Sequence, residues 1–239
     1  MARRAHFGMM PAMPEAGMVR SMFARVADRY DRANRVLSLG IDITWRRAAI
    51  KVAALKPGER VLDVCCGTGD LALALAGAGA DVTGTDFCAP MLSHALRKSK
   101  SSPLPWLAAD TMSLPFPDAS FDLATVAFGI RNVADPVLGM REMARVVRPG
   151  GRVVVLEFCK PKMPIVRSAY LFYFRRILPT LGRWVSKDRD GAYDYLPASV
   201  MAFPERAEFL ALMTRAGLSA PSARYLSCGI AAVYRAERI

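Results

Sequence analysis

The residues of this chain best suited to chemistry form a short loop after an apolar run. Residues 61–64 are apolar apart from Asp63 and lead into Cys65-Cys66-Gly67-Thr68-Gly69-Asp70, and a second acidic residue, Asp86, ends the next apolar run. An apolar strand, a glycine loop and a helical stretch over 71–78 predict the first unit of a doubly wound sheet, where ligands lie beyond the carboxyl ends of the strands. Gly67 and Gly69 let the backbone approach a ligand closely, and Asp86 is placed to accept hydrogen bonds from both hydroxyls of a ribose. The pattern therefore predicts a nucleoside-cofactor site.

Two cofactors fit this geometry, because Gly67-x-Gly69-x-x-Ala72 also satisfies a relaxed dinucleotide fingerprint. Asp63 separates them, since it lies inside the strand just before the loop. There it would repel a pyrophosphate and attract the ammonium of a methionine group, which favours S-adenosylmethionine over NAD. The alternative is that Asp63 and the glycines only form a turn at the end of a strand, and the spacing of Asp86 argues against it.

Length and composition predict one large α/β domain. The chain has 239 residues, of which 53% are hydrophobic, enough for a substantial core. No apolar run approaches the roughly 20 residues that cross a bilayer, and no hydrophobic signal core follows Arg3 and Arg4. We therefore expect a cytoplasmic protein. Five cysteines without a C-x-x-C pair argue against a disulfide framework, and with His6 and His94 as the two histidines no metal site is expected.

The formal net charge of +12 predicts a basic surface that would favour RNA, anionic lipid or an acidic substrate. Basic and aromatic residues are interleaved through residues 160–189. In a helix, the apolar side chains of this segment would share one face and the basic ones would lie largely opposite, although Pro179 should break the helix. Two interpretations stay open: an ordinary cover helix with a solvated basic side, or a helix that contacts a membrane surface or a lipid tail. The apolar face comprises Val166, Tyr170, Phe174, Ile177, Leu181 and Trp184, and the basic face Arg175, Arg176, Arg183 and Lys187.

The alternation of apolar and amphipathic stretches predicts a single domain built from βαβ units. Residues 1–18, rich in Met, Pro and Gly, are expected to form a mobile tail, and residues 19–239 a single domain. Residues 19–55 should form a helical cap over the site with a break at Ser38-Leu39-Gly40, and residues 160–190 a basic aromatic helical insertion. Arg148-Pro149-Gly150-Gly151 predicts a helix stop and a turn before a strand buried on both faces. Strands are expected near 60–65, 81–86, 105–109, 121–127, 152–157, 218–226 and 230–236, and helices near 69–77, 89–99, 134–148 and 204–216.

Several motifs outside the loop are more specific than the loop itself. They are Phe23-Ala24-Arg25-Val26-Ala27-x-x-Tyr30-Asp31-x-x-Asn34-x-x-Leu37-Ser38-x-Gly40 followed by Trp45-Arg46, Leu114-Pro115-Phe116-Pro117-Asp118 with Phe121-Asp122, Phe128-Gly129-Ile130-Arg131-Asn132-Val133, Leu156-Glu157-Phe158-x-Lys160-Pro161, Tyr193-x-Tyr195-Leu196-x-x-Ser199, and Phe203-Pro204. With these motifs the chain resembles the ubiquinone/menaquinone biosynthesis C-methyltransferase family (UbiE/MenG) from about residue 20 to the C-terminus.

The resemblance implies an α/β fold of class I S-adenosylmethionine-dependent methyltransferases, Rossmann-like, with a seven-stranded, mostly parallel sheet and helices on both faces. It also implies transfer of a methyl group from S-adenosylmethionine to a ring carbon of a prenylated quinol, which leaves S-adenosylhomocysteine as the product. The substrate would be demethylmenaquinol, a ubiquinol precursor, or both.

The family's cofactor contacts, carried over by resemblance, fall on Thr68 in the loop, Asp86 at the ribose, and Asp110 with Thr111 beside the adenine. The chain has Asp110-Thr111 where many members have Asn-Ala, and Ala127 where many have Ser. Asp110 can still accept a hydrogen bond from the adenine amino group, whereas Ala127 can offer only its backbone.

The expected chemistry needs a deprotonated ring hydroxyl, because a phenolate pushes charge onto its ortho carbon. The enzyme should therefore act on the reduced quinol and fail with the oxidised quinone. Arg131 is the candidate to stabilise the phenolate or position a water, and Asn132 the candidate to hold a ring oxygen. The alternative is that Arg131 pairs with a core carboxylate such as Asp122 and Asn132 caps the next helix. Tyr30 and Tyr195 are candidates for lining the substrate cavity.

A polyprenyl tail keeps such a quinol in a membrane, since each buried CH₂ contributes about 0.8 kcal/mol. We therefore expect peripheral contact with the inner (cytoplasmic) membrane through residues 160–187, and the sequence leaves a homodimer open. Two other functions also stay open: methylation of another small molecule, such as a sterol or polyketide, or methylation of RNA. The chain has no Asn-Pro-Pro-aromatic motif and no appended RNA-binding domain, so nucleic acid is not an expected partner.

Overall fold

The computed structural model describes residues 16–178, 180 and 192–239. Its centre is a seven-stranded sheet of order β3-β2-β1-β4-β5-β7-β6. Strand β7 runs antiparallel to both of its neighbours, and the other pairs are parallel. The sequence-based fold class is therefore confirmed. The strands are β1 Arg60–Val64, β2 Asp81–Asp86, β3 Trp106–Ala108, β4 Phe121–Ala127, β5 Val147–Phe158, β6 Leu218–Leu226 and β7 Ala231–Arg238.

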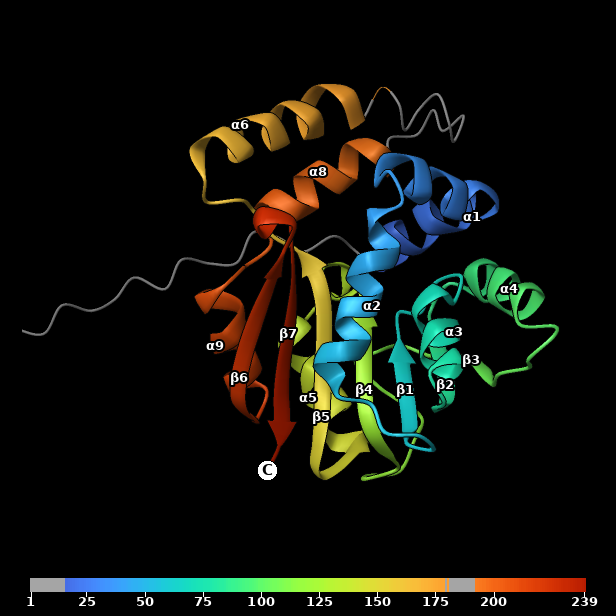
Figure 1. Cartoon of the computed structure of the whole chain (residues 1–239). Helices are drawn as coiled ribbons and strands as arrows, with labels where there is room; N and C mark the ends of the chain where they lie inside the picture. The colour runs from blue at the N-terminus through green and yellow to red at the C-terminus, as the bar shows by residue number, and fades with distance from the viewer. Residues whose placement is uncertain (1–15, 179, 181–191) are drawn as a thin grey trace, which may run out of the picture.

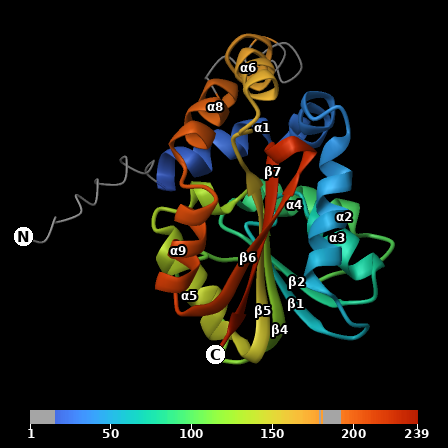
Figure 2. The same ribbon diagram turned by 60° about the vertical axis from the view of Figure 1, so that its left-hand side comes forward.

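Helices cover both faces of the sheet (Figure 2). Helices α2 (Ile41–Ala53) and α3 (Asp70–Gly77) pack on one face, and α5 (Pro136–Val146) and α9 (Ala207–Arg215) on the other. The strands alternate accordingly, as Val61 of β1 belongs to the core under α2 and α3, whereas Leu62 and Val64 belong to the core under α5 and α9. Helix α4 (Ala89–Lys98) packs against β2 and β3.

A helical cap lies over the edge of the sheet where the parallel strands end (Figure 1). It consists of α1 (Ala16–Leu37), α6 (Pro164–Phe172), the π-helical turn η2 (Tyr173–Ile177) and α8 (Ala192–Ala202). Gly40, with φ of 75°, separates α1 from α2 at the expected break. Helix α1 begins at Ala16, within the tail expected for residues 1–18, and residues 1–15 lie outside the described part of the chain.

Strand β5 begins earlier than expected. The preceding helix stops at Val146, but Arg148-Pro149-Gly150-Gly151 forms a bulge within the strand instead of a turn before it. Val147 pairs with Phe121 and Arg152 with Leu123, so β5 gains residues relative to β4 between these two pairs. Gly150 has φ of 72°, and a Cβ atom on Gly151 would lie 2.7 Å from a backbone oxygen of β4.

The insertion expected over residues 160–190 is helical where the structure describes it, through α6 and η2. Tyr170 and Phe174 of the expected apolar face are buried, whereas Ile177 is 37% exposed. Arg176 of the expected basic face is exposed. Pro179, Leu181, Arg183, Trp184 and Lys187 lie outside the described residues. Within the described ranges, the chain holds no helix of the length and apolarity that a membrane span requires.

Candidate active site

The loop after β1 turns the chain back toward α3 through residues with positive φ. These are Cys65 (49°), Gly67 (57°) and Gly69 (84°). A Cβ atom on Gly69 would lie 2.6 Å from the ring of Trp106, so this position tolerates only glycine without displacing that ring. Cys65 is a non-glycine residue in the left-handed region, and such backbone strain clusters at functional sites. Phe128 at the end of β4 shares this feature, with φ of 57°.

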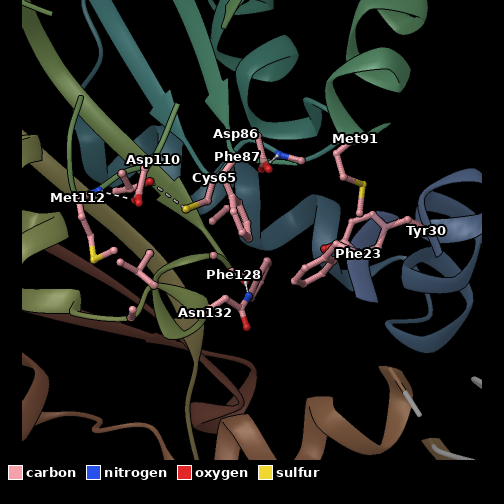
Figure 3. Close-up of a pocket in the computed structure, with 16 residues that line it drawn as sticks. Phe23, Tyr30, Cys65, Asp86, Phe87, Met91, Asp110, Met112, Phe128 and Asn132 are labelled. Atoms are coloured by element: carbon pink, nitrogen blue, oxygen red, sulfur yellow. Dashed lines mark hydrogen bonds between the residues drawn. The ribbon is translucent and has the colours of Figure 1, made fainter. Parts of the chain in front are cut away.

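A cavity of about 70 Å³ opens at the carboxyl ends of β1, β2 and β4, and Figure 3 shows its lining. Asp110 and Met112 lie at one end, and Phe23 and Tyr30 of the cap lie at the other. Of the residues that the sequence predicts for the site, Tyr30, Gly67, Asp86, Asp110, Thr111, Ala127 and Asn132 line this cavity. The lining also contains residues that the sequence patterns do not mark as site residues: Phe23, Cys65, Phe87, Met91, Met112, Phe128, Gly129, Val133 and Ala134.

Asp86 is held in place by the backbone around it. The residue is 7% exposed, and its carboxylate accepts hydrogen bonds from the backbone N–H groups of Gly67 (Oδ2, 2.8 Å) and Cys88 (Oδ1, 2.8 Å). Burial raises the pKa of Asp86 to about 6. Each carboxylate oxygen can accept a further hydrogen bond, so the group fits the two hydroxyls of a ribose.

The opposite end of the cavity suits a base. Asp110 accepts a hydrogen bond from the backbone N–H of Met112 at 2.9 Å, which leaves its other carboxylate oxygen able to accept from an amino group. Thr111 is buried, and its hydroxyl lies 3.2 Å from the Sγ atom of Cys65. An adenosine would therefore extend from Asp110 past Asp86, with its remaining substituent directed toward the cap.

Asp63, Thr68 and Gly69 do not line the cavity, although the sequence predicts cofactor contacts for them. Asp63 is 1% exposed and accepts a hydrogen bond from the Thr125 hydroxyl at 2.7 Å, while its Oδ2 atom has no partner. Thr68 is 2% exposed because its hydroxyl donates to Asp31 of the cap and accepts from Lys98 at 3.2 Å. Asp63 can therefore attract a positively charged group of a cofactor electrostatically, from its buried position in β1 beneath the loop, without contacting it.

Cofactor affinity is expected to fall as the pH falls from about 7 to about 6. Burial raises the pKa of Asp63 to about 7 and that of Asp86 to about 6, so both carboxyls are neutralised over this range. A ligand with an ammonium group and ribose hydroxyls favours the ionised forms, so its binding lowers both pKa values and releases protons. Calorimetry at pH 6.5 in buffers of different ionisation enthalpy should detect this release, and Asp63→Asn should reduce it.

The same two groups act on folding with the opposite sign. The native chain binds more protons than the unfolded chain between the usual aspartate pKa and these raised values, so their contribution to stability is lost as the pH rises through 6 and 7.

An affinity for the ligand that stayed constant from pH 8 to pH 6 would contradict the assignment of both carboxylates to the cofactor.

A second cavity, of about 270 Å³, lies between the cap and the sheet, and both cavities are lined by Phe23, Tyr30 and Phe128. Arg131 and Tyr195 line this larger cavity, so the structure brings all four candidate catalytic and substrate residues to one of the two cavities or to both. The remaining lining is mostly apolar and comes mainly from α1, α2, α8 and the segment from α6 to the end of η2. It includes Val26, Leu37, Trp45, Phe174, Leu178 and Leu196.

Arg131 lies in the short helix η1 (Ile130–Asn132) and is 7% exposed. Its Nη1 atom donates to Oε1 of Glu157 at 2.9 Å and to the backbone oxygen of Phe128. Its guanidinium carbon lies 5.5 Å from the centre of the Phe158 ring. Pairing with a core carboxylate is thus confirmed, but that carboxylate is Glu157, because Asp122 instead binds Arg148 at 2.6 Å. The signal for Glu157 was present in the Leu156-Glu157-Phe158 motif.

Asn132 does not cap the next helix, since Asp135 accepts hydrogen bonds from the first backbone N–H groups of α5. The Oδ1 atom of Asn132 instead accepts a hydrogen bond from the Tyr195 hydroxyl at 3.0 Å. Three buried polar atoms nearby have no partner: Nε of Arg131, Oε2 of Glu157 and the hydroxyl of Tyr170. An ordered water or a polar ligand in this region would satisfy them.

The tyrosines around these atoms are donors and not bases. Burial raises the pKa of Tyr30, Tyr170 and Tyr195, so their hydroxyls remain protonated at neutral pH. Together with Arg131, the hydroxyls of Tyr30 and Tyr170 can stabilise a negative charge on an oxygen that enters the larger cavity, whereas the Tyr195 hydroxyl already donates to Asn132. His94 lies in neither cavity and pairs with Asp28 at 2.9 Å. Among the described residues, no cluster of three or more His, Cys, Asp or Glu side chains could hold a metal ion.

Comparison with known proteins agrees with the family resemblance that the sequence motifs indicate. The sequence model of the ubiE/COQ5 methyltransferase family matches residues 11–238. A demethylmenaquinone methyltransferase of Thermus thermophilus is 47% identical over 223 residues, which cover 91% of this chain and 100% of that protein. The ubiquinone/menaquinone biosynthesis C-methyltransferase UbiE of Bdellovibrio bacteriovorus is 46% identical over 228 residues, with 93% and 96% covered.

Solved structures with the same fold include two S-adenosylmethionine-dependent methyltransferases. One, from Thermotoga maritima, superposes with a TM-score of 0.64 at 21% identity and covers 92% of this chain and 99% of its own. The other, from Aquifex aeolicus, has a TM-score of 0.59 at 18% identity, with 81% and 89% covered. At these identities the likeness concerns the fold alone.

Proposed function

Because the chain belongs to the ubiE/COQ5 methyltransferase family, we propose that it methylates a ring carbon of a prenylated quinol in respiratory quinone biosynthesis. It is an S-adenosylmethionine-dependent methyltransferase. The proposal for the substrate is supported by relatives named for demethylmenaquinone and for ubiquinone/menaquinone biosynthesis. The single observation that supports it best is the apolar cavity with Arg131 in its wall, which adjoins the cavity that fits an adenosine.

S-adenosylmethionine supplies an electrophilic methyl group and leaves as S-adenosylhomocysteine. Gly67, Asp86 and Asp110 would hold its adenosine, while Asp63 would favour its ammonium from below the loop. The chain's own task is to orient the quinol ring and make its carbon nucleophilic. Arg131 would position a water that takes the proton of the ring hydroxyl and would stabilise the oxygen that is left. Asn132 with Tyr195 would hold the same region of the ring. The apolar walls would exclude bulk water and receive the start of the prenyl tail.

The proposal is tested by incubating the purified protein with methyl-labelled S-adenosylmethionine and one acceptor at a time, followed by mass spectrometry. The acceptors are demethylmenaquinol, a reduced ubiquinone precursor, their oxidised quinones, and bulk RNA. We expect label on one or both quinols and at most about a hundredth of that rate on the quinones, because a quinone has no hydroxyl to deprotonate. Label on RNA, or on no quinol while the cofactor still binds, would contradict the proposed substrate class.

We also propose that the chain works in the cytoplasm at the surface of the inner membrane, where its substrate lies. Leu39 (83% exposed) and Ile41 (40% exposed) line the larger cavity and face solvent at the corner between α1 and α2. The Tyr173 hydroxyl donates to the backbone oxygen of Leu37 at 2.7 Å, so η2 meets this corner, and Phe172 beside it is 62% exposed. Exposed apolar side chains at the mouth of an apolar cavity suit contact with acyl chains.

The double variant Leu39→Ser/Ile41→Ser is expected to weaken binding to anionic phospholipid vesicles by at least about 30-fold, because each lost apolar side chain removes about 1 kcal/mol or more of burial free energy and every 1.4 kcal/mol is a factor of ten in affinity. Co-sedimentation measures the affinity. Ile239→Ser is the matched control, since Ile239 is 83% exposed and lies at the end of the molecule opposite the cap (Figure 1). Equal losses of vesicle affinity in both variants would indicate non-specific hydrophobic adsorption and not docking at the cavity mouth.

A further inference from the structure

One charged side chain at the larger cavity has an unused hydrogen-bonding edge. Arg46 of α2 lines that cavity, and its side chain is 13% exposed. Its Nη1 atom donates to Oδ2 of Asp42, and its Nη2 atom lies 3.8 Å from Oδ2 of Asp70, beyond hydrogen-bond length. Its Nε atom is buried and has no partner. In a guanidinium group, one N–H bond of Nε and one of Nη2 point in the same direction. This free edge can therefore donate two parallel hydrogen bonds to one carboxylate.

The position of Arg46 corresponds to the end of the cofactor that the adenosine site leaves open. Its guanidinium carbon lies 5.7 Å from the centre of the Phe128 ring, and Phe128 belongs to the walls of both cavities. Helix α2 covers the face of the sheet to which Val61 and Asp63 of β1 belong by strand alternation. The positive charge of Arg46 also favours the ionised form of Asp63, which agrees with a guanidinium above the end of β1.

Charge balance points to the same residue. An amino-acid group carries an ammonium and a carboxylate, and Asp63 with its unpartnered Oδ2 atom offers charge for the ammonium only. Among the described residues that line either cavity, the cations are Arg46 and Arg131. Arg131 is committed to Glu157 and to the quinol in the proposed function. Lys98 lines neither cavity, and its ammonium already contacts Asp31, Thr68 and Asp70.

We propose that Arg46 binds the carboxylate of the methionine part of the cofactor through its Nε and Nη2 atoms. The inference rests on the cofactor half of the proposed function and not on the quinol. It gives helix α2 a role at the cofactor site, because Arg46 belongs to α2 and not to the loops that hold the adenosine. A cofactor that lacks the carboxylate would leave this contact with α2 unmade.

The test compares two ligands by isothermal titration calorimetry. S-adenosylhomocysteine has the carboxylate, whereas its decarboxylated analogue keeps the adenosine, the thioether and the amine. Arg46→Gln should weaken S-adenosylhomocysteine binding by about 10- to 100-fold, the range of a charge-assisted bidentate contact, and should change the affinity for the analogue less than two-fold. Arg46→Lys keeps the charge but cannot donate two parallel hydrogen bonds. Its affinity for S-adenosylhomocysteine should lie between those of the wild type and Arg46→Gln. Arg47→Gln is the control, because Arg47 is the exposed neighbour on the same helix.

Equal weakening of both ligands by Arg46→Gln, or no weakening of S-adenosylhomocysteine, would overturn the inference. The first result would mean that Arg46 acts by holding Asp42 and the cap, and a lowered unfolding temperature would accompany it. A wild-type chain that binds neither ligand would instead remove the cofactor half of the proposed function, which separates that failure from the failure of the Arg46 contact.

Discussion

Asp86→Ala is expected to weaken binding of S-adenosylmethionine and S-adenosylhomocysteine by at least about 100-fold. Two hydrogen bonds from ribose hydroxyls to a buried carboxylate contribute about 1.5–3 kcal/mol each, and every 1.4 kcal/mol is a factor of ten in affinity. The carboxylate also accepts from the backbone N–H groups of Gly67 and Cys88, so its loss removes support from the loop as well. Calorimetry with S-adenosylhomocysteine measures the effect directly.

The matched control is Asp81→Ala, which removes an exposed carboxylate from the other end of the same strand. It should leave the affinity within two-fold of wild type. Asp86→Asn keeps the shape of the side chain but turns one acceptor into an N–H donor that faces a backbone N–H group, so it should also bind at least ten-fold more weakly. An Asp86→Ala protein that is folded and binds normally would show that the ribose is held elsewhere.

The fold was predictable because each element carries a local signal of its own. The strand through Val153, Val154 and Val155 is apolar on both sides, as expected for a parallel strand between two helical layers. The helices around it were predictable because their apolar residues recur with the 3.6-residue period of an α-helix. The bulge in β5 was not predictable, since Pro149-Gly150-Gly151 has the local chemistry of a turn. What keeps it in the sheet is tertiary: the pairing of Val147 with Phe121 and the close approach of Gly151 to β4.

The site was predictable where a residue directly follows a strand. Gly67 follows β1 in the turn to α3, Asp86 ends β2 and Asp110 follows β3, so all three reach the same edge of the sheet. A residue within a strand obeys a different constraint. Asp63 pairs in register with Thr125, and strand alternation directs both side chains into the layer under α2, away from the cavity surface.

The positions contributed by the cap could not be read from local patterns. Thr68 is covered because Asp31 of α1 and Lys98 of α4 converge on its hydroxyl, and this convergence exists only once α1 has docked. Tyr170 appeared in the sequence as one member of an apolar helix face. In the folded chain it is 6% exposed and its hydroxyl lacks a partner, which makes it a polar group of the larger cavity.

Arg131→Met is expected to lower both stability and turnover, for separable reasons. Glu157 is 1% exposed and Arg131 is its ion-pair partner, so removing the guanidinium leaves a buried carboxylate uncompensated. Breaking a buried pair in this way costs about 3–5 kcal/mol of folding free energy. Burial already raises the pKa of Glu157, so the variant should recover stability as the pH falls and the carboxyl protonates. Urea unfolding at several pH values measures this loss.

Turnover should respond differently from stability in the double variant Arg131→Met/Glu157→Gln. This variant removes both charges, so we expect most of the folding free energy to return. Its kcat for the reduced quinol should stay about 10²–10³-fold below wild type, since no guanidinium remains to stabilise the ring oxygen. Affinity for S-adenosylhomocysteine should stay near wild type, because Arg131 does not line the smaller cavity. If the double variant regained full turnover, Arg131 would be a partner for Glu157 alone, and the ring oxygen would have to be stabilised by hydrogen bonds from the neutral tyrosine hydroxyls around it.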